Sequence, residues 1–336
     1  MENVTIRMLA EKLQLSTATI SKALNNSHEI SEETRKRVQE LAKELNYVPN
    51  PYASSLRKKS SKTIAVVIPE VADSFFAEAI NGIEAVAKEK GYHVLIYLTH
   101  ENSQQEQAIL NDFQSGRVDG ILISVTMETA ASEHGLAHLS KELPIVFFDR
   151  VCEELPTARV TTNDKEAAFI ATRHLIERGC RNIGLLAASQ QLSIIRQRIS
   201  GYEKALKEAG LPLSPNAVTY YTNDTVSNYK KVCEILRQHR FDGIIATTEK
   251  LATSVYEACE TLGIRMPDEL KVVGFSNLST ARFLQPSLTT VAQPAFEMGK
   301  TAATLLFRSL KNNHFPLAHQ QVEIPSQLVI RQSTAV

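Results

Sequence analysis

The sequence predicts a small all-α headpiece followed by a two-lobed α/β domain with parallel sheets. Residues 1–48 contain no glycine and show only helical spacing of apolar residues. From Thr63 onward, short apolar runs alternate with amphipathic helices, a pattern typical of parallel sheets with right-handed crossovers. Segments 118–122 and 241–245 resemble each other, and each opens an apolar run after an amphipathic helix. This duplication predicts two similar lobes.

Length and composition narrow the class of protein. A chain of 336 residues is too long for one ordinary core and suggests two or three domains. The apolar content of 43% and charged content of 22% argue against disorder. No apolar run approaches a membrane span, and residues 1–5 do not begin a secretory signal. The four cysteines form no CxxC pair or disulfide framework, so we expect a cytoplasmic protein with reduced thiols and no membrane association.

Three short helices are expected within residues 1–48. Thr5, Ser16 and Ser31 are their predicted N-caps. The first two helices are joined by a tight turn, which matches the helix-turn-helix outline. In that motif the second helix enters the major groove, with its N-terminal residues at the base edges. The residues at these positions, which we expect to read bases, are Thr17, Ala18 and Lys22.

Short polar side chains of the headpiece are suited to DNA phosphates, which position a protein without specifying sequence. For each of them alone, helix capping or turn formation is an equally good explanation. The predicted phosphate contacts are Thr5, Ser16, Thr19, Ser21, Asn25 and Thr34.

The domain prediction follows these patterns. Residues 1–48 form the helix-turn-helix domain, 49–62 a hinge helix and linker, and 63–336 the α/β domain. Its N-lobe spans about 63–160 plus 293–321, and its C-lobe about 163–291 plus 322–336. Segments 288–294 and 322–331 supply late strands or crossovers. The main expected strands are 64–68, 94–98, 120–123, 145–148, 183–187, 218–221, 243–246 and 272–275.

Polar residues follow several of these strands, at the sheet edge where parallel α/β folds bind ligands. If the two lobes face each other, these residues share one cleft that suits a polar small molecule such as a sugar. Arg198 adds a fork of donors for carboxylate, phosphate or sugar hydroxyls. For any one of these residues, a solvated position in a loop or on a helix is an about equally good explanation of the residue type. The strand-end residues are Asp73, Ser74, Phe75, Phe76, Ser124, Thr126, Asp149, Arg150, Thr248, Glu249, Ser276 and Asn277.

Enzyme signatures are absent from the sequence. GxSxG, GxxxxGK[ST], GxGxxG and HExxH do not occur. His134 and His138 are four residues apart, but no third ligand accompanies them, so a solvated helix face explains them better than a metal site. We predict no catalytic residue, metal or cofactor.

Together these features resemble the LacI/GalR (lactose-repressor/galactose-repressor) family of bacterial transcription regulators, over nearly the whole chain. The resemblance is strongest from Val4-Thr5-Ile6 to Asn25, through Ser31-x-x-Thr34-Arg35-x-Arg37-Val38, and along 45–56. Further similar motifs are Phe148-Asp149-Arg150, Arg198-x-x-Gly201-Tyr202, Val273-Gly274-Phe275, Leu288-Thr289-Thr290-Val291-x-Gln293-Pro294 and Leu328-Val329-Ile330-Arg331.

The resemblance implies a dimer on a palindromic double-stranded DNA operator and a type I periplasmic-binding-protein-like effector domain. It implies that a hinge helix contacts the minor groove through Asn50, Ala53, Leu56 and Arg57, with Leu56 as the wedge. It also implies effector contacts for a set that includes two residues not singled out above, Asn223 and Gln293. The predicted effector-binding residues are Asp73, Phe75, Ser124, Asp149, Arg150, Arg198, Asn223, Thr248, Ser276 and Gln293.

Several positions depart from the family pattern. Gln14 stands where the family usually has glycine in the turn, and Lys22 replaces a common arginine. In the cleft, Thr248 and Glu249 replace a usual Asn-Asp pair, and Ser276 replaces an aspartate. Because Arg198 is retained, we expect a sugar or sugar derivative, acidic ones included.

The expected function is therefore a transcriptional regulator, a repressor by family resemblance, controlled by a small effector. The alternative is a non-exported sugar-binding protein or sugar-converting enzyme with an accessory helical domain. The zero net charge does not argue against DNA binding, because residues 1–62 hold 11 Lys+Arg and 7 Asp+Glu, balanced by an acidic remainder. The basic excess lies at Arg57, Lys58, Lys59 and Lys62.

Overall fold

The computed structural model describes residues 4–47, 60–131, 135–214, 216–222, 224–312 and 316–335. The chain divides into two compact units, Met1–Ser61 and Lys62–Val336. The predicted hinge residues Asn50, Ala53, Leu56 and Arg57, and the predicted effector residue Asn223, lie outside the described part of the chain.

The N-terminal unit contains three helices, α1 (Ile6–Leu13), α2 (Thr17–Leu24) and α3 (Glu32–Glu44). The three predicted N-caps are confirmed, since Thr5, Ser16 and Ser31 each accept a hydrogen bond from a backbone N–H of the following helix. Gln14 ends α1 in the left-handed region, with φ 54° and ψ 40°, a conformation that glycine adopts at lower cost. The core of this unit is formed by Leu9, Ala10, Ile20, Ala23, Val38 and Ala42.

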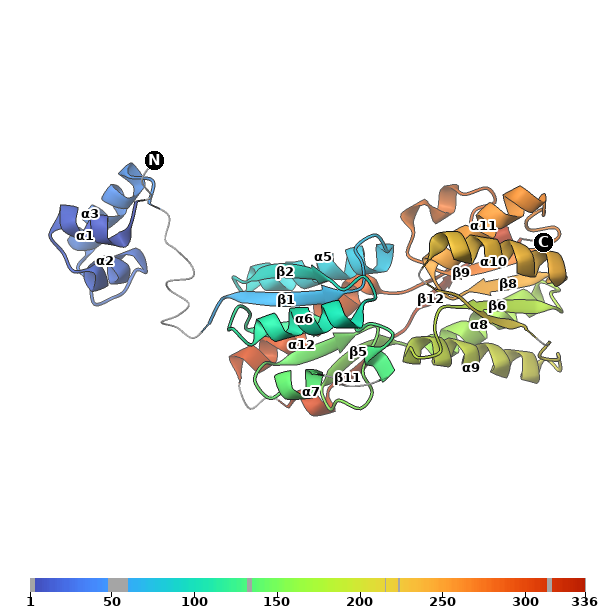
Figure 1. The fold of residues 1–336 in the computed structure, drawn as a ribbon. Coiled ribbons are helices and arrows are strands. Elements are labelled where there is room, and N and C mark those ends of the chain that lie inside the picture. The colour runs from blue at the N-terminus through green and yellow to red at the C-terminus, as the bar shows by residue number, and fades with distance from the viewer. Residues whose placement is uncertain are drawn as a thin grey trace. The chain divides into compact units, whose positions relative to one another are not determined.

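The second unit consists of two six-stranded sheets, one in each lobe (Figure 1). The N-lobe sheet has the order β11-β5-β4-β3-β1-β2, and the C-lobe sheet has the order β12-β10-β9-β8-β6-β7. In each sheet, the first strand of the lobe therefore lies between the second and third strands of that lobe: β1 lies between β2 and β3, and β6 lies between β7 and β8. All pairs are parallel except the antiparallel pair of β10 and β12. The predicted pair of α/β lobes with parallel sheets is confirmed.

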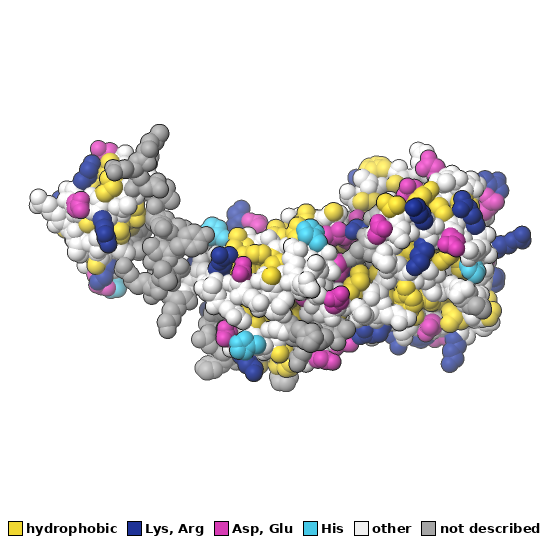
Figure 2. All heavy atoms as spheres, viewed as in Figure 1, with side chains coloured by type: hydrophobic (Ala, Val, Ile, Leu, Met, Phe, Trp, Pro, Cys, Tyr) yellow, Lys and Arg dark blue, Asp and Glu magenta, His cyan; other side chains and the backbone are white. Residues whose placement is uncertain are grey.

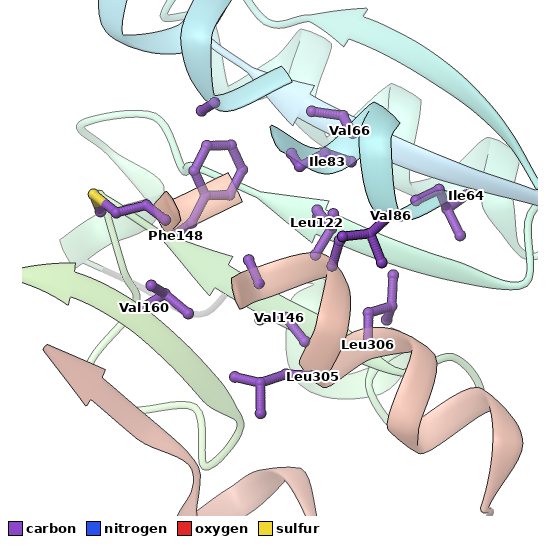
Figure 3. Packing of buried hydrophobic residues seen from close by; sticks show 14 of the residues in the cluster. Ile64, Val66, Ile83, Val86, Leu122, Val146, Phe148, Val160, Leu305 and Leu306 are labelled. Carbon is purple, nitrogen blue, oxygen red and sulfur yellow. The ribbon is translucent and has the colours of Figure 1, made fainter. Parts of the chain in front are cut away.

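Helices cover both faces of the N-lobe sheet. Residues Ile64, Val66 and Ile68 of β1 pack against α5 and α12, as the close view in Figure 3 shows for part of this cluster. The alternate residues Ala65 and Val67 pack with α6 and α7 on the other face. The bounds are β1 (Thr63–Ile68), α5 (Ser74–Glu89), β2 (His93–Leu98), α6 (Ser103–Phe113), β3 (Gly120–Ile123), η1 (Thr129–Ala131), α7 (Leu136–Leu139), β4 (Ile145–Phe148), β5 (Ala158–Thr162), α12 (Ala295–Lys311), η3 (Leu317–His319) and β11 (Gln321–Ile324).

The C-lobe repeats this layering. Leu185 and Ala187 of β6 pack with α8 and α9, whereas Leu186 packs with α10 and α11. The bounds are α8 (Asp164–Glu177), β6 (Ile183–Ala187), α9 (Ser193–Glu208), β7 (Val218–Tyr220), α10 (Thr225–Gln238), β8 (Gly243–Ala246), α11 (Glu249–Leu262), β9 (Lys271–Phe275), η2 (Ser279–Phe283), β10 (Thr289–Ala292), β12 (Gln327–Val329) and η4 (Gln332–Thr334).

Two details of the predicted lobes need correction. Ala158–Thr162 forms β5 and pairs with β4, although no strand was expected there. Segment 322–331 was expected to belong to the C-lobe from residue 322, but β11 pairs with β5 in the N-lobe sheet, and only β12 joins the C-lobe. The chain therefore crosses between the lobes after β11, because the ladder beside β5 holds Gln321–Ile324 in the N-lobe.

Helices α5 and α12 approach each other closely because glycine occupies both sides of the contact. A Cβ atom on Gly82 would lie 2.0 Å from the carbonyl oxygen of Phe296. One on Gly299 would lie 2.0 Å from the carbonyl oxygen of Ala79. Both distances are far inside van der Waals contact with backbone, which cannot rotate away as a side chain can. The N-lobe therefore requires the absence of a side chain at these two positions.

We expect Gly82→Ala to lower the free energy of unfolding by about 1–3 kcal/mol, because α5 and α12 must move apart to admit the methyl group. Urea unfolding followed by circular dichroism measures this change. Asn81→Ala, at an exposed position of the same helix, is the matched control and should not lower the free energy of unfolding. Equal stability of the two variants would contradict the close-packing explanation.

Candidate functional site

A cleft lies where the carboxyl-terminal ends of strands from both lobes meet, the position expected for a ligand in parallel α/β sheets. The structure brings together eight of the ten predicted effector residues there. They come from the loops after β1, β4, β8, β9 and β10 and from helices α5 and α9. These eight are Asp73, Phe75, Asp149, Arg150, Arg198, Thr248, Ser276 and Gln293.

Arg198 forms the C-lobe wall of the cleft and is buried there. Its Nε donates to Asp164 Oδ1 at 2.6 Å, and its Nη1 donates to the carbonyl oxygen of Thr247 at 2.5 Å. The guanidinium carbon lies 4.1 Å from the ring centre of Phe275, a cation–π contact. These contacts fix the guanidinium plane and leave Nη2 as its nitrogen without a hydrogen-bond partner among the described residues.

Asp149 and Arg150 form the facing N-lobe wall. Arg150 donates through Nη1 to Glu101, and its Nε lies 3.9 Å from Asp149 Oδ2. Asp149 has a left-handed backbone, with φ 60°, and its N–H donates to the carbonyl oxygen of Val160 at 3.0 Å. Aspartate tolerates this conformation better than most residues. The strained turn after β4 therefore places a carboxylate and a guanidinium side by side in the cleft.

The carboxylates of the cleft lie in an environment that disfavours their charged form. Burial raises the pKa of Asp149 to about 6, against the lowering effect of Arg150 and Arg198. Burial also raises the pKa of Asp73, and the nearby carboxylates Glu249 and Glu70 raise it further. Asp73 Oδ1 partly offsets this by accepting a hydrogen bond from the N–H of Phe75 at the start of α5.

Several polar atoms buried in the cleft wall have no hydrogen-bond partner among the described residues. They are Arg150 Nε, Arg198 Nη2, Thr247 Oγ1 and Gln293 Nε2. Buried polar atoms usually have partners, so this cluster indicates that a bound molecule completes their hydrogen bonding. The space between the lining side chains is only about 40 Å³, room for a few water molecules. A ligand the size of a sugar therefore requires the lobes to separate or side chains to move.

Three direct polar contacts join the lobes beside this space. Glu249, in the first turn of α11, accepts a hydrogen bond from the Ser74 hydroxyl of α5. Lys250 pairs with Glu70 at 2.7 Å, and Asn277 Nδ2 donates to Glu78 Oε2 at 2.7 Å. Each contact links the loop after β1, or helix α5, to the C-lobe.

Two predicted effector residues are not among the cleft-lining residues. Ser124 is buried behind the wall, where its hydroxyl accepts a hydrogen bond from the N–H of Arg150 at 3.4 Å. It therefore supports Arg150 from behind the lining of the ligand-free cleft, and its contact with an effector stays a prediction. Asn223 lies outside the described residues.

Six further lining residues were not in the predicted effector-binding set. Three of them, Phe76, Glu249 and Asn277, were among the strand-end residues expected to share the cleft, and the structure places them there. Thr247 directly follows β8, Phe275 ends β9 and Ile194 lies in the first turn of α9, and only the fold places these three residues at the cleft. The six are Phe76, Ile194, Thr247, Glu249, Phe275 and Asn277.

The second helix of the headpiece presents an exposed polar face. Thr17, Ala18 and Lys22 are exposed on α2, whereas Ile20 and Ala23 of the same helix are buried. The predicted base-reading residues are thus accessible and share a helix. Lys22 forms an ion pair with Glu29, and both side chains are about half exposed. An exposed ion pair of this kind contributes little to stability, so a contact between Lys22 and DNA can replace it at low cost.

Five of the six predicted phosphate contacts of the headpiece, all except Ser21, form local side-chain hydrogen bonds at helix ends. Thr5 and Ser16 accept hydrogen bonds from the N–H groups of Met8 and Thr19. Thr19 and Thr34 form hydroxyl pairs at 2.9 Å with Ser16 and Ser31, respectively. Asn25 donates to the carbonyl oxygen of Ser21 at 2.7 Å. Capping accounts for these side chains in the free headpiece, and their contact with phosphate stays a prediction.

The described residues contain no group of three or more His, Cys, Asp or Glu side chains arranged to hold a metal ion. No helix among them is long and apolar enough to cross a membrane. Of the two histidines four residues apart, His138 lies 3.7 Å from Glu142 on the exposed surface, and His134 lies outside the described residues.

We expect the buried Asp149 to make the domain less stable as pH rises. Because its pKa is about 6 in the folded chain and near 3.8 when unfolded, the unfolded chain loses this proton first. The free energy of unfolding therefore falls between about pH 4 and pH 6, and the loss remains above pH 6. Asp149→Asn should remove this penalty, worth on the order of 3 kcal/mol at pH 7.5. Urea unfolding at pH 4 and pH 7.5 measures it.

Asp112→Asn, on the exposed surface, serves as control and should keep the pH dependence of the wild type. The same pH dependence in Asp149→Asn and the wild type would show that the buried carboxyl does not carry this effect.

The chain is similar to known proteins over both units. Residues 5–50 match the bacterial regulatory proteins of the lacI family, and residues 172–334 match the periplasmic binding protein-like domain. Over 332 residues, it is 31% identical to the ribose operon repressor of Halalkalibacterium halodurans, covering 98% of this chain and 97% of that protein. It is 30% identical to the HTH-type transcriptional repressor CytR of Escherichia coli K12, covering 98% and 96%.

Among solved structures, the lac repressor dimer bound to operator and the anti-inducer ONPF has the same fold. The TM-score is 0.86 over 100% of both chains, at 22% identity. The helix-turn-helix unit, the paired α/β lobes and the full-length identity to two repressors agree. The chain therefore belongs to the lacI family of bacterial regulatory proteins and is a DNA-binding transcriptional regulator.

Proposed function

We propose that this regulator is a homodimeric repressor that binds a palindromic operator and responds to a sugar or sugar derivative held in the cleft. The observation that carries the effector proposal is the mixed lining of the cleft. Unpartnered donors such as Arg198 Nη2 and Gln293 Nε2 lie beside the carboxylates of Asp73 and Asp149. A hydroxyl group both donates and accepts hydrogen bonds, so a polyhydroxyl ligand satisfies both kinds of group. The aromatic ring of Phe75 suits the apolar face of such a ligand.

The relatives support this assignment by their names, since one is a ribose operon repressor. Action on chromosomal DNA agrees with a cytoplasmic location. Repression, and no enzymatic turnover in the cleft, is the expected behaviour of this family. A chain that converts a sugar to a product would instead support the sugar-converting alternative, and a product assay on any stabilising sugar tests this.

A second copy of the chain is the proposed protein partner. A single helix-turn-helix reads only one half-site, so a palindrome requires two. The lac repressor of the same fold is a dimer on its operator. In this chain β2 lies at the edge of the N-lobe sheet and exposes Leu95 and Ile96, each more than 40% accessible. Burial of this edge against a second copy would cover both the apolar side chains and the open strand.

The effector proposal predicts a distinctive behaviour for Thr247→Val. The Thr247 hydroxyl is buried without a partner, so replacing it by a methyl group should leave the ligand-free stability unchanged or slightly higher. Binding of the effector should weaken by about tenfold, because a hydrogen bond to the ligand is lost. Thermal unfolding against a panel of neutral pentoses, hexoses, disaccharides and uronic acids identifies the ligand and measures the loss.

Thr219→Val, on β7 and outside the cleft, is the control and should bind as the wild type does. If no panel member raises the melting temperature of the wild type, the sugar assignment is wrong.

The DNA proposal predicts that Lys22→Ala loses sequence discrimination. Selection from random duplexes with the full chain should yield a palindrome with two half-sites. On that sequence we expect Lys22→Ala to weaken binding by about 1 kcal/mol or more, and on random DNA by much less, because a base contact specifies and a phosphate contact does not. Fluorescence anisotropy at fixed salt measures both affinities.

Lys207→Ala, an exposed change of equal charge in the second unit, should leave both affinities unaltered. Equal loss on the selected and random sequences would mean that Lys22 contacts only the DNA backbone.

A further inference from the structure

A carboxylate on the C-lobe side of the cleft, other than those of Asp73 and Asp149, connects the two lobes. Glu249 lies in the first turn of α11, after the N-cap Thr248. Its Oε2 accepts a hydrogen bond from the Ser276 hydroxyl at 2.9 Å within the C-lobe. The same oxygen accepts the hydroxyl of Ser74, which belongs to the first turn of α5 in the N-lobe. One side-chain oxygen therefore joins the two lobes through two hydroxyl groups.

The neighbouring contacts reinforce this bridge. Lys250, the residue after Glu249 on α11, forms an ion pair with Glu70 at 2.7 Å. Glu70 lies four residues before Ser74. Asn277, one residue after Ser276, donates to Glu78 at 2.7 Å and also to the carbonyl oxygen of Gln293. These three contacts thus lie between the same two chain regions, the stretch from Glu70 to Glu78 and the loops that begin α11 and follow β9. A further ion pair across the lobes, between Arg196 of α9 and Glu153 after β4 at 2.7 Å, lies between other segments.

The bridge is also opposed by like charge. Glu249 and Glu70 lie close enough to Asp73 to raise its pKa further, beyond the effect of burial. The two guanidiniums that line the cleft do not neutralise these groups fully, because Arg198 is paired with Asp164 and Arg150 with Glu101. Figure 2 shows acidic side chains along the boundary between the lobes on the face in view. The hydrogen bonds to Glu249 therefore hold its carboxylate near that of Asp73 in the other lobe, against the repulsion between these two groups.

We propose that Glu249 is a cross-cleft latch, which holds the lobes together in the ligand-free chain and is displaced by the effector. The geometry gives the latch two properties. Without ligand, its two hydroxyl donors stabilise the closed cleft, where little free space remains. With ligand, a hydroxyl of the effector replaces Ser74 as a donor to the same carboxylate, so the latch becomes part of the site. A ligand that carries a carboxylate or phosphate at this point cannot donate and is repelled.

This inference rests on the proposed function only for the nature of the displacing ligand. The latch itself is a property of the ligand-free chain and is testable without DNA or effector. Failure of the latch therefore leaves the proposed regulator intact, and failure of the sugar panel leaves the latch measurement unaffected.

The test is a distance measurement between the lobes by pulsed electron paramagnetic resonance. Spin labels are attached to cysteines introduced at the exposed positions Lys88 on α5 and Lys207 on α9. The four native cysteines are buried, which leaves the introduced thiols as the reactive ones. The labelled full-length chain is mixed with an excess of unlabelled chain, so that a dimer carries a single pair of labels. The labelled chain is measured as wild type, Glu249→Ala, Ser74→Ala, Glu249→Gln and Glu260→Ala.

We expect one narrow distance distribution for the wild type. In Glu249→Ala and Ser74→Ala, the ratio of closed to open chains should fall by about tenfold, seen as a second, displaced distance population, because a hydrogen bond to a charged group is lost. Glu249→Gln retains an acceptor oxygen and should give an intermediate ratio. Glu260→Ala, an exposed glutamate on the same helix, should match the wild type.

Two results would overturn the latch. The first is a distribution for Glu249→Ala that coincides with those of the wild type and Glu260→Ala. The second is a change in Glu249→Ala without any change in Ser74→Ala, which would place the role of Glu249 within the C-lobe, through Ser276. Ser74→Ala removes only a hydroxyl near the surface of α5, so it keeps the test decisive if Glu249→Ala folds poorly.

Discussion

The buried ion pair between Arg198 and Asp164 organises the functional half of the C-lobe. It connects the first residue of α8 to the second turn of α9, and the same guanidinium reaches the carbonyl oxygen of Thr247, directly after β8. Burying two charges is costly unless each is paired and hydrogen-bonded, so the pair constrains every element that supplies a contact. Its cation–π contact with Phe275 adds the end of β9 to the same assembly. One arginine thereby holds two helices and two strand ends in the arrangement that forms the cleft wall.

The cleft uses helix beginnings for two purposes at once. Asp73 caps α5 and Thr248 caps α11, and both side chains also line the cleft. Capping fixes the side-chain position before any ligand arrives, which reduces the entropy lost on binding. The same logic applies in the headpiece, where Ser16 caps α2 and orients the helix that carries Lys22. In the cleft, the same side chains, Asp73 and Thr248, therefore cap a helix and line the space for the ligand.

Local physics accounts for what could be predicted from the sequence. The caps Thr5, Ser16 and Ser31 depend on contacts three residues away, so their residue types suffice to predict them. The buried strands were predicted because both faces are covered, which produces continuous apolar runs such as Ile64–Ile68. Strand β5 was missed because its alternate residues Arg159 and Thr161 are only half-buried and interrupt that run. The place of β11 depends on pairing with β5, and no local pattern reports it.

The sequence by itself determined the class of fold, the helix-turn-helix motif, the lobe duplication and most of the residues that meet in the cleft. Strand ends of parallel sheets must share one edge, so residues that follow strands were predictable as neighbours. Tertiary structure alone decided which of them face the ligand space, which support it from behind, as Ser124 does, and which act across it. The contact between Ser74 and Glu249 spans 175 residues of chain, and its formation depends on how the two lobes meet. Hydrogen bonds of that range follow from the packing of whole elements, which residue spacing does not encode.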